Sequence, residues 1–137
     1  MKRIGSCTIT RNEDVDQLRF DWGVIRMLSE ARVTGASSFS FGYVELETGQ
    51  GHVRHNHPTA DEVIYVLSGE GDQMLDDQPA VRVTSGDCIW IPKGVYHSTI
   101  NRGDEAMRLI VVYAPAGAEQ ALREDPAVEI VPAGRGN

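Results

Sequence analysis

Two histidines and a glutamate near the middle of the chain have the types and spacing of metal ligands. His55 and His57 are two positions apart, so on an extended strand both imidazoles point to the same face. Glu62 begins the next apolar run, where it shares a face with Ile64 and Val66. A carboxylate among aliphatic side chains is costly unless something pairs with it. A metal ion bound by both imidazoles would be such a partner.

Short β-type runs separated by turn residues must position these side chains. The runs are rich in β-branched and aromatic residues and follow one another at intervals of about ten residues, which is typical of an antiparallel sandwich or barrel. The expected strands are Val24–Leu28, Ser38–Leu46, Gly51–His57, Glu62–Leu67, Gln73–Leu75, Ala80–Thr84, Cys88–Ile91, Tyr96–Thr99 and Met107–Tyr113. The chain has no GxGxxG motif and no alternation of strands with helices, which disfavours a nucleotide-binding α/β fold.

A third histidine lies in a second unit of the same kind. The run Cys88–Ile91 meets the turn residues Pro92, Lys93 and Gly94, and His97 opens the returning strand. The chain therefore offers two hairpin-like units. One carries His-x-His and a glutamate, and the other carries a single histidine.

Both units hold particular residues at fixed spacings. The first reads G-x5-H-x-H-x4-E-x6-G and the second reads G-x5-P-x-G-x2-H-x3-N. The fixed positions are Gly49, His55, His57, Glu62 and Gly69 in the first, and Gly86, Pro92, Gly94, His97 and Asn101 in the second. Together they resemble the two motifs of the cupin superfamily, and the short gap between them is similar to that of small single-domain bacterial cupins. The resemblance implies an all-β fold, an antiparallel double-stranded β-helix or jelly-roll barrel.

The resemblance also implies that four side chains point into the barrel and bind one divalent transition metal ion: His55, His57, Glu62 and His97. Imidazoles and a carboxylate suit Mn, Fe, Co, Ni, Cu or Zn, and affinity alone does not choose among them. The set lacks thiolates and so differs from a closed structural zinc site. Four ligands around an octahedral ion leave two positions for water, substrate or dioxygen. Glu62 is also the one candidate catalytic residue, as a proton acceptor that detaches from the ion.

Three classes of function fit this centre. The first is a metal-dependent enzyme acting on a small organic molecule, as a dioxygenase, decarboxylase, isomerase or lyase. The second is a non-catalytic protein that binds a small carboxylate or sugar through the metal. The third is a structural or storage role. Open coordination positions favour the enzyme. The sequence does not reveal the substrate, the reaction class or the metal.

The whole chain, 1–137, is expected to form one domain, with a barrel core at about 24–115, an N-terminal arm at 1–23 and a C-terminal helix and tail at 116–137. Helical signal is confined to the ends. Asn12–Leu18 is predicted to make a turn or two of helix capped by Asn12, and Ala118–Glu124 a helix that stops before Pro126. Pro132–Asn137 is predicted to be a frayed tail.

Composition excludes several partners. The net charge of the 137-residue chain is −7 and its acids and bases are interspersed, which argues against nucleic acid and anionic membranes. No stretch approaches the roughly 20 apolar residues of a membrane helix, and Cys7 and Cys88 form no CxxC pair, so the cytoplasm is the expected compartment. A small organic molecule is the expected ligand. Similarity to dimeric cupins predicts a homodimer, with Val24–Leu28 and the stretch before Ser38 available to add a strand to a second copy.

Structural roles are expected for most other notable residues. His52 is expected near the barrel rim without binding metal, and Arg54, opposite in parity to His55, is expected to form a salt bridge. Gly94 and Asn101 are expected to shape turns. Packing is expected for the residues that alternate with apolar neighbours, with Cys88 buried among them: Tyr43, Tyr65, Cys88, Trp90 and Tyr113.

Overall fold

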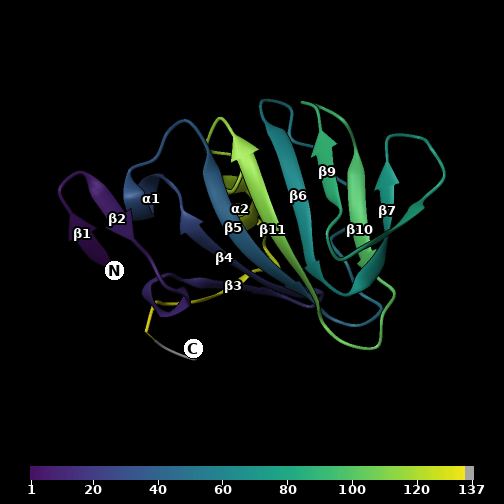
Figure 1. The fold of residues 1–137 in the computed structure, drawn as a ribbon, viewed down its shortest axis with the longest axis horizontal. Coiled ribbons are helices and arrows are strands. Elements are labelled where there is room, and N and C mark those ends of the chain that lie inside the picture. Colours follow the sequence, from purple (N-terminus) through teal and green to yellow (C-terminus); the bar gives the residue numbers. More distant parts are fainter. Residues whose placement is uncertain (135–137) are drawn as a thin grey trace.

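Two antiparallel sheets form the body of the protein in the computed structural model, which describes residues 1–134 (Figure 1). The large sheet has the strand order β12 (Glu129–Val131), β3 (Gln17–Phe20), β4 (Gly23–Ser29), β5 (Ser40–Leu46), β11 (Met107–Ala114), β6 (Asp61–Ser68) and β9 (Cys88–Ile91). The small sheet has the order β10 (His97–Asn101), β7 (Glu70–Leu75) and β8 (Val81–Thr84). A separate hairpin joins β1 (Lys2–Ile4) to β2 (Cys7–Ile9).

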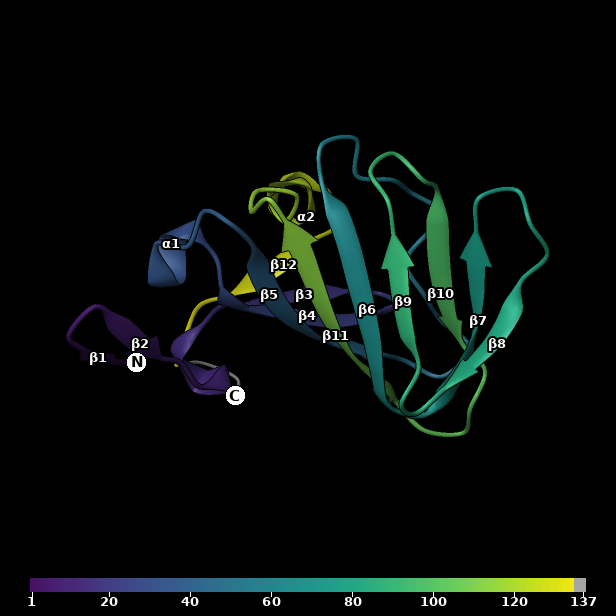
Figure 2. The same cartoon turned by 45° about the horizontal axis from the view of Figure 1, so that its top comes forward.

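The helical segments are short: a 3-10 turn at Asn12–Asp14, α1 (Ala31–Thr34) and α2 (Gln120–Glu124). In Figure 2, α2 lies beside the end of β11, from which the chain leaves the large sheet. The prediction of an antiparallel all-β fold with minor helical turns is confirmed.

Inward-facing side chains of both sheets form one apolar core. Along β11, Met107, Leu109, Val111 and Tyr113 are buried, and the residues between them are more exposed. This period of two is the expected result of a pleated strand with one face turned inward. β11 pairs with β5 on one side and β6 on the other, so its inward side chains lie at the centre of the large sheet.

The segment predicted as the strand Gly51–His57 is not a strand. It meets β10 at two isolated bridges, one between Gly51 and Ile100 and one between His55 and His97. At the first bridge a side chain on Gly51 would collide with the carbonyl oxygen of Thr99, so only glycine allows this approach. The segment is therefore a loop held against β10, and His55 and His57 are carried by that loop.

The predicted helix Asn12–Leu18 is wrong beyond its first turn. Only Asn12–Asp14 is helical. The N-cap is Arg11 and not Asn12, and the Arg11 N–H donates to the Asp14 carboxylate at 2.8 Å. Leu18 instead lies in β3, fully buried and paired with Ile25 and Ile130. Cross-strand packing on both sides of β3 outweighs the weak local preference for a helix.

The C-terminal region contains one strand that was not predicted. β12 extends the large sheet beyond β3. The barrel core was predicted to span about 24–115, and the large sheet includes β3 before that range and β12 after it. The predicted helix Ala118–Glu124 forms only over Gln120–Glu124.

The described part of the predicted frayed tail is hydrogen-bonded. The Ala133 N–H donates to the Asp16 carboxylate at 3.1 Å, and the Gly134 N–H donates to the Glu13 carbonyl at 3.0 Å. The rest of the tail, 135–137, lies outside the described residues. Among residues 1–134 no helix is long and apolar enough to span a membrane.

Three residues that were expected to pack are exposed. Cys88, Trp90 and Tyr65 lie on the outer face of β9 and β6, where Trp90 is 65% and Tyr65 is 41% exposed. The alternation in β9 is as predicted, but Ile89 and Ile91 face the core. The predictions of a buried Cys88 and of packing roles for Trp90 and Tyr65 are therefore wrong, because a two-sided apolar pattern does not tell which face is covered.

Candidate metal centre

The four side chains named by the motifs converge on one point. The ligating atoms of His55, His57, Glu62 and His97 lie within 4.8 Å of one another. The Glu62 Oε1 atom is 3.1 Å from His57 Nε2 and 2.8 Å from His97 Nε2. Glu62 is 4% exposed and His97 is 2% exposed, so these two lie in the interior, whereas His55 and His57 are partly buried.

Strand pairing places Glu62 in this cluster. Glu62 lies opposite Tyr113 of β11 and Ile91 of β9, near the start of β6. The burial pattern of β6 turns Glu62, Ile64 and Val66 to the same inner face, as their parity predicts. The carboxylate is thus fixed from both sides by the central part of the large sheet.

The bridge between His55 and His97 brings their two rings together. The His55 N–H donates to the His97 carbonyl at 3.1 Å, and the His97 N–H donates to the His55 carbonyl at 2.8 Å. The Nδ1 atoms lie 2.7 Å from the Val53 carbonyl and 3.0 Å from the Val95 carbonyl. Because a carbonyl oxygen only accepts, each Nδ1 carries the proton, and each Nε2 keeps its lone pair for a cation.

The polar atoms of the cluster are poorly satisfied without a further partner. His57 Nε2, His97 Nε2 and Glu62 Oε1 are buried, and none makes a well-directed hydrogen bond within the described residues despite the short distances. Buried polar atoms are nearly always paired, and an unpaired one costs about 1–3 kcal/mol. Lone pairs that converge without donors are the arrangement expected around a cation, so these residues fit a metal ion.

Protonation of the cluster also suits a cation. Burial raises the pKa of the Glu62 carboxyl, but the His57 and His97 imidazoles beside it outweigh that effect and hold the pKa at about 2. Burial lowers the pKa of His55 to about 3, helped by the neighbouring His52. For His97, burial lowers the pKa and the Glu62 carboxylate raises it by more, so the net shift is upward. At neutral pH the site therefore offers a charged carboxylate and a neutral His55.

Two cavities adjoin the cluster. One, of about 50 Å³, lies inside the barrel, where Glu62, His97, Thr99 and Tyr113 meet aliphatic walls. The other, of about 190 Å³, lies between the ligand loop and α2, and its lining includes Asn56, Ala121 and Leu122. His52 and His55 line both cavities.

The structure gives other predicted residues clear positions. His52 is not part of the four-residue cluster found among residues 1–134, although its ring contacts the ring of His55. Arg54 points away from the cluster and forms the expected ion pair, 3.0 Å from Asp77. Asn101 shapes a turn: its amide donates to the Leu46 and Glu105 carbonyls at 3.0 and 2.8 Å.

Sequence reasoning missed one residue that lines the site. Tyr113 packs in the core as predicted, but its ring also lies 4.9 Å from the ring of His57, in the wall of the inner cavity. Burial, together with the nearby Glu62 carboxylate, raises the pKa of Tyr113 well above its usual value, so the hydroxyl stays protonated. The β6–β11 register places Tyr113 opposite Glu62, and that register is not visible in the sequence.

Comparison with known proteins agrees with this architecture. The Cupin domain family matches residues 42–113, which is more than half of the chain, and the chain therefore belongs to the cupin family. Protein SchB of Streptomyces halstedii is 33% identical over 103 residues, covering 75% of this chain and 74% of SchB. The predicted cupin jelly-roll is confirmed.

Two further similar proteins have names that mention polyketides. The tetracenomycin polyketide synthase protein TcmJ of Streptomyces glaucescens is 27% identical over 100 residues, covering 73% of this chain and 66% of TcmJ. The solved structure of the polyketide cyclase RemF from Streptomyces resistomycificus has a TM-score of 0.68 and 26% identity. The structural match covers 96% of this chain and 85% of the RemF chain.

Proposed function

We propose that this cupin is a metal-dependent enzyme that cyclises a small polyketide-type molecule. The observation that carries the metal-dependent part is the convergence of three imidazoles and one carboxylate, with their ligating atoms within 4.8 Å and with Glu62 and His97 buried. The names of TcmJ and RemF support the polyketide part. A homodimer and a cytoplasmic location remain predictions.

His55, His57, Glu62 and His97 would hold the ion, which fits their unsatisfied buried atoms. When bound, a divalent metal supplies Lewis-acid chemistry, which polarises carbonyl oxygens and favours enolate character. The metal identity stays open because this donor set suits several divalent ions.

The chain's own residues would bind and orient the reacting end of the substrate. The inner cavity is small, about 50 Å³, so it admits the reacting carbonyl groups and not a whole polyketide. Aliphatic side chains such as Ile64, Leu109 and Val111 line that cavity and exclude water from it. The protonated Tyr113 hydroxyl is the donor available to a ketone oxygen there.

The proposed reaction is an intramolecular aldol condensation. A new bond joins an enol carbon of the substrate to a ketone carbon further along the same chain. The enol-forming carbon gives up two hydrogens, one before the bond forms and one during dehydration, and both leave with the ketone oxygen as water. Glu62, detached from the ion, accepts the protons released from the enol-forming carbon, and Tyr113 stabilises the ketone oxygen that gains charge. No oxidant or reductant is consumed.

The small inner cavity also favours a second candidate, a non-catalytic protein that binds a small carboxylate or sugar through the metal. A volume of about 50 Å³ is far below the roughly 300 Å³ of a typical ligand pocket. In that case the metal-loaded protein would bind a compound such as oxalate without changing it.

Turnover by the metal-loaded protein tests the proposal. Protein freed of metal and reloaded with Mn²⁺, Co²⁺, Ni²⁺ or Zn²⁺ is incubated with a synthetic linear β-polyketone, and products are followed by mass spectrometry. We expect loss of one water per molecule, faster than the uncatalysed reaction, with Tyr113→Phe reducing the rate by roughly 10- to 100-fold while metal content is unchanged. Binding without conversion of any polyketone would support the non-catalytic candidate. A wild-type protein that binds no metal would reject both.

The predicted mode of dimerisation does not agree with the fold. Val24–Leu28 was expected to add a strand to a second copy, but β4 is already paired on both sides, with β3 and with β5. A homodimer would therefore have to use another surface.

A further inference from the structure

A row of neighbouring rings, the first three of them stacked, runs from the large sheet to the metal centre. The rings of Phe20 and Trp22 are 4.6 Å apart and nearly parallel, at 9°. Trp22 stacks on His52 at 4.9 Å and 24°, and His52 lies against His55 at 4.0 Å and 36°. The His52 ring is therefore in contact with a tryptophan and with a candidate metal ligand.

His55 needs this support more than the other ligands do. His97 lies in β10, and Glu62 lies in β6 between two partner strands. His55 lies in a loop that touches β10 at isolated bridges. The ligating nitrogen of His55 lies within 4.8 Å of the other three ligating atoms. His57 and His97 also make short contacts with Glu62 Oε1, and no such contact joins His55 to Glu62.

The surroundings of the His55 ring leave it room to turn. One cavity lies on its inner side and another lies toward α2, and the His55 side chain lines both. The contact between Nδ1 and the Val53 carbonyl, at 2.7 Å, restrains one edge of the ring. Of the three histidine rings around it, His52 lies nearest to the His55 ring and is the least tilted against it, at 4.0 Å and 36°, whereas His57 and His97 lie at 75° and 59°.

We infer that His52, backed by Trp22 and Phe20, is a positioning residue that holds the His55 imidazole ready to bind the metal. This inference rests on the proposed metal site but not on the polyketide reaction. His52 acts through its flat ring and not as a ligand, so an aromatic replacement should perform the same task. Partners that orient metal ligands typically contribute about 10- to 100-fold to metal affinity.

Two variants and a matched control separate positioning from general packing. His52→Ala removes the ring, and His52→Phe keeps a flat ring without nitrogen atoms. Arg54→Ala alters the same loop on its other side, where Arg54 contacts Asp77 and the Asp76 carbonyl at 3.0 and 2.8 Å. Metal affinity is measured by competition with a chromophoric chelator, using Zn²⁺. The imidazole ¹H–¹⁵N spectrum of the metal-free protein reports the tautomer and mobility of His55.

We expect His52→Ala to weaken Zn²⁺ binding by roughly tenfold or more, and to broaden or average the His55 ring signals in the metal-free protein. His52→Phe should restore both, and Arg54→Ala should change neither. The inference is overturned if His52→Ala leaves both readouts unchanged, if His52→Phe does not restore them, or if Arg54→Ala has an equal effect. A wild-type protein that binds no Zn²⁺ would reject the metal site, while the His55 signals would still decide whether His52 holds the ring.

Discussion

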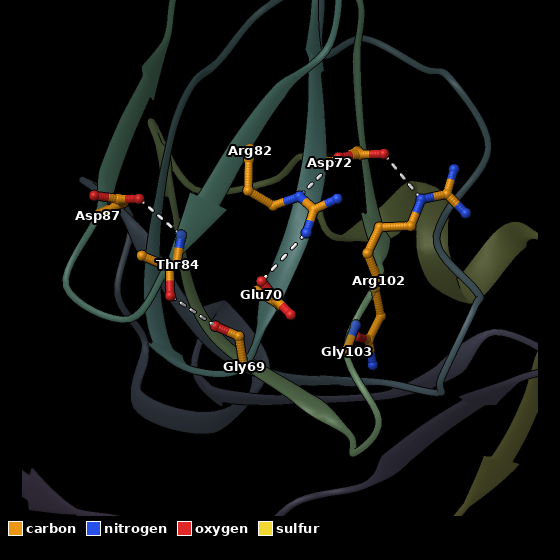
Figure 3. A network of polar contacts seen from close by, with 9 residues as sticks. Gly69, Glu70, Asp72, Arg82, Thr84, Asp87, Arg102 and Gly103 are labelled. Atoms are coloured by element: carbon orange, nitrogen blue, oxygen red, sulfur yellow. Dashed lines mark hydrogen bonds and ion pairs between the residues drawn. The ribbon is translucent and has the colours of Figure 1, made fainter.

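Two polar clusters of four side chains each, among the described residues, differ in exposure: one is exposed and the other lies mostly inside the barrel. In the exposed cluster, Arg82 contacts Asp72 and Glu70 at 3.1 and 3.2 Å, and Arg102 contacts Asp72 at 2.9 Å (Figure 3). Its four side chains are between 30% and 54% exposed. Two cations face two anions across β7, β8 and the turn after β10, so every charge has an opposite charge nearby and water as well.

The buried cluster has the opposite balance. Three imidazoles surround one carboxylate in a region where Glu62 and His97 are almost fully covered. Three of the cluster's atoms lack a well-directed hydrogen bond within the described residues. An exposed network that is fully paired stabilises a fold slightly, whereas a buried carboxylate carries a desolvation cost that its partners must offset. The comparison indicates that the first cluster serves the fold and the second serves a function.

We expect the largest effect on metal affinity from Glu62→Gln, in the buried cluster. The amide is almost the same size but cannot supply a negative charge, so affinity for Zn²⁺ should fall on the order of 100-fold or more. In the metal-free protein the melting temperature should also fall, because the lowered pKa of Glu62 means that the fold favours its charged form. Chelator competition and thermal unfolding in the presence of EDTA measure the two effects. A lower melting temperature with unchanged Zn²⁺ affinity would mean that the buried cluster is merely structural.

Metal affinity should also depend on pH, in a direction set by His97. The pKa of His97 is raised in the metal-free protein, so below that pKa a bound proton must leave before the nitrogen can bind a metal. Affinity for Zn²⁺ should therefore fall as pH falls, by up to roughly tenfold per pH unit for one released proton. Titrations between pH 5 and pH 8 measure this slope. Equal metal content at both ends of the range would count strongly against bound imidazoles.

The smallest effect is expected for Arg82→Ala in the exposed cluster. Exposed ion pairs contribute little, so the melting temperature should fall by no more than roughly 2 °C, and metal affinity should not change. The Arg102 and Arg82 guanidinium groups lower the pKa of Asp72. The contribution of these two ion pairs to the stability of the fold is therefore fully present above the usual pKa of aspartate, 3.8. That contribution is lost as pH falls through the lowered pKa of Asp72. Thermal unfolding of both proteins at high salt is the check, and a difference that survives there would show that Arg82 stabilises by packing.

The sequence was most informative where a physical period linked it to the structure. The two-residue spacing of His55 and His57, and the parity of Glu62 with Ile64, predict a shared face, and the side chains do converge. This worked even though the segment around His55 is a loop, because two bridges hold that loop against β10.

The sequence was least informative where the answer depends on distant partners. Leu18 was assigned to a helix, but its strand is decided by Ile25 and Ile130, the latter more than a hundred residues away. For Trp90 the alternation was clear, yet nothing local tells which side the core occupies. The ring stack on His52 likewise joins Trp22 to a loop that is distant in the sequence. Contacts of this kind follow from the assembled fold and not from a local pattern.

The most direct test of the metal centre is a crystal structure of the protein loaded with zinc, with anomalous data collected on both sides of the zinc absorption edge. We predict one zinc peak per chain inside the barrel, within roughly 2.0–2.3 Å of the Nε2 atoms of His55, His57 and His97 and of a Glu62 carboxylate oxygen. A barrel without a zinc peak, or a peak held by other residues, would contradict the account.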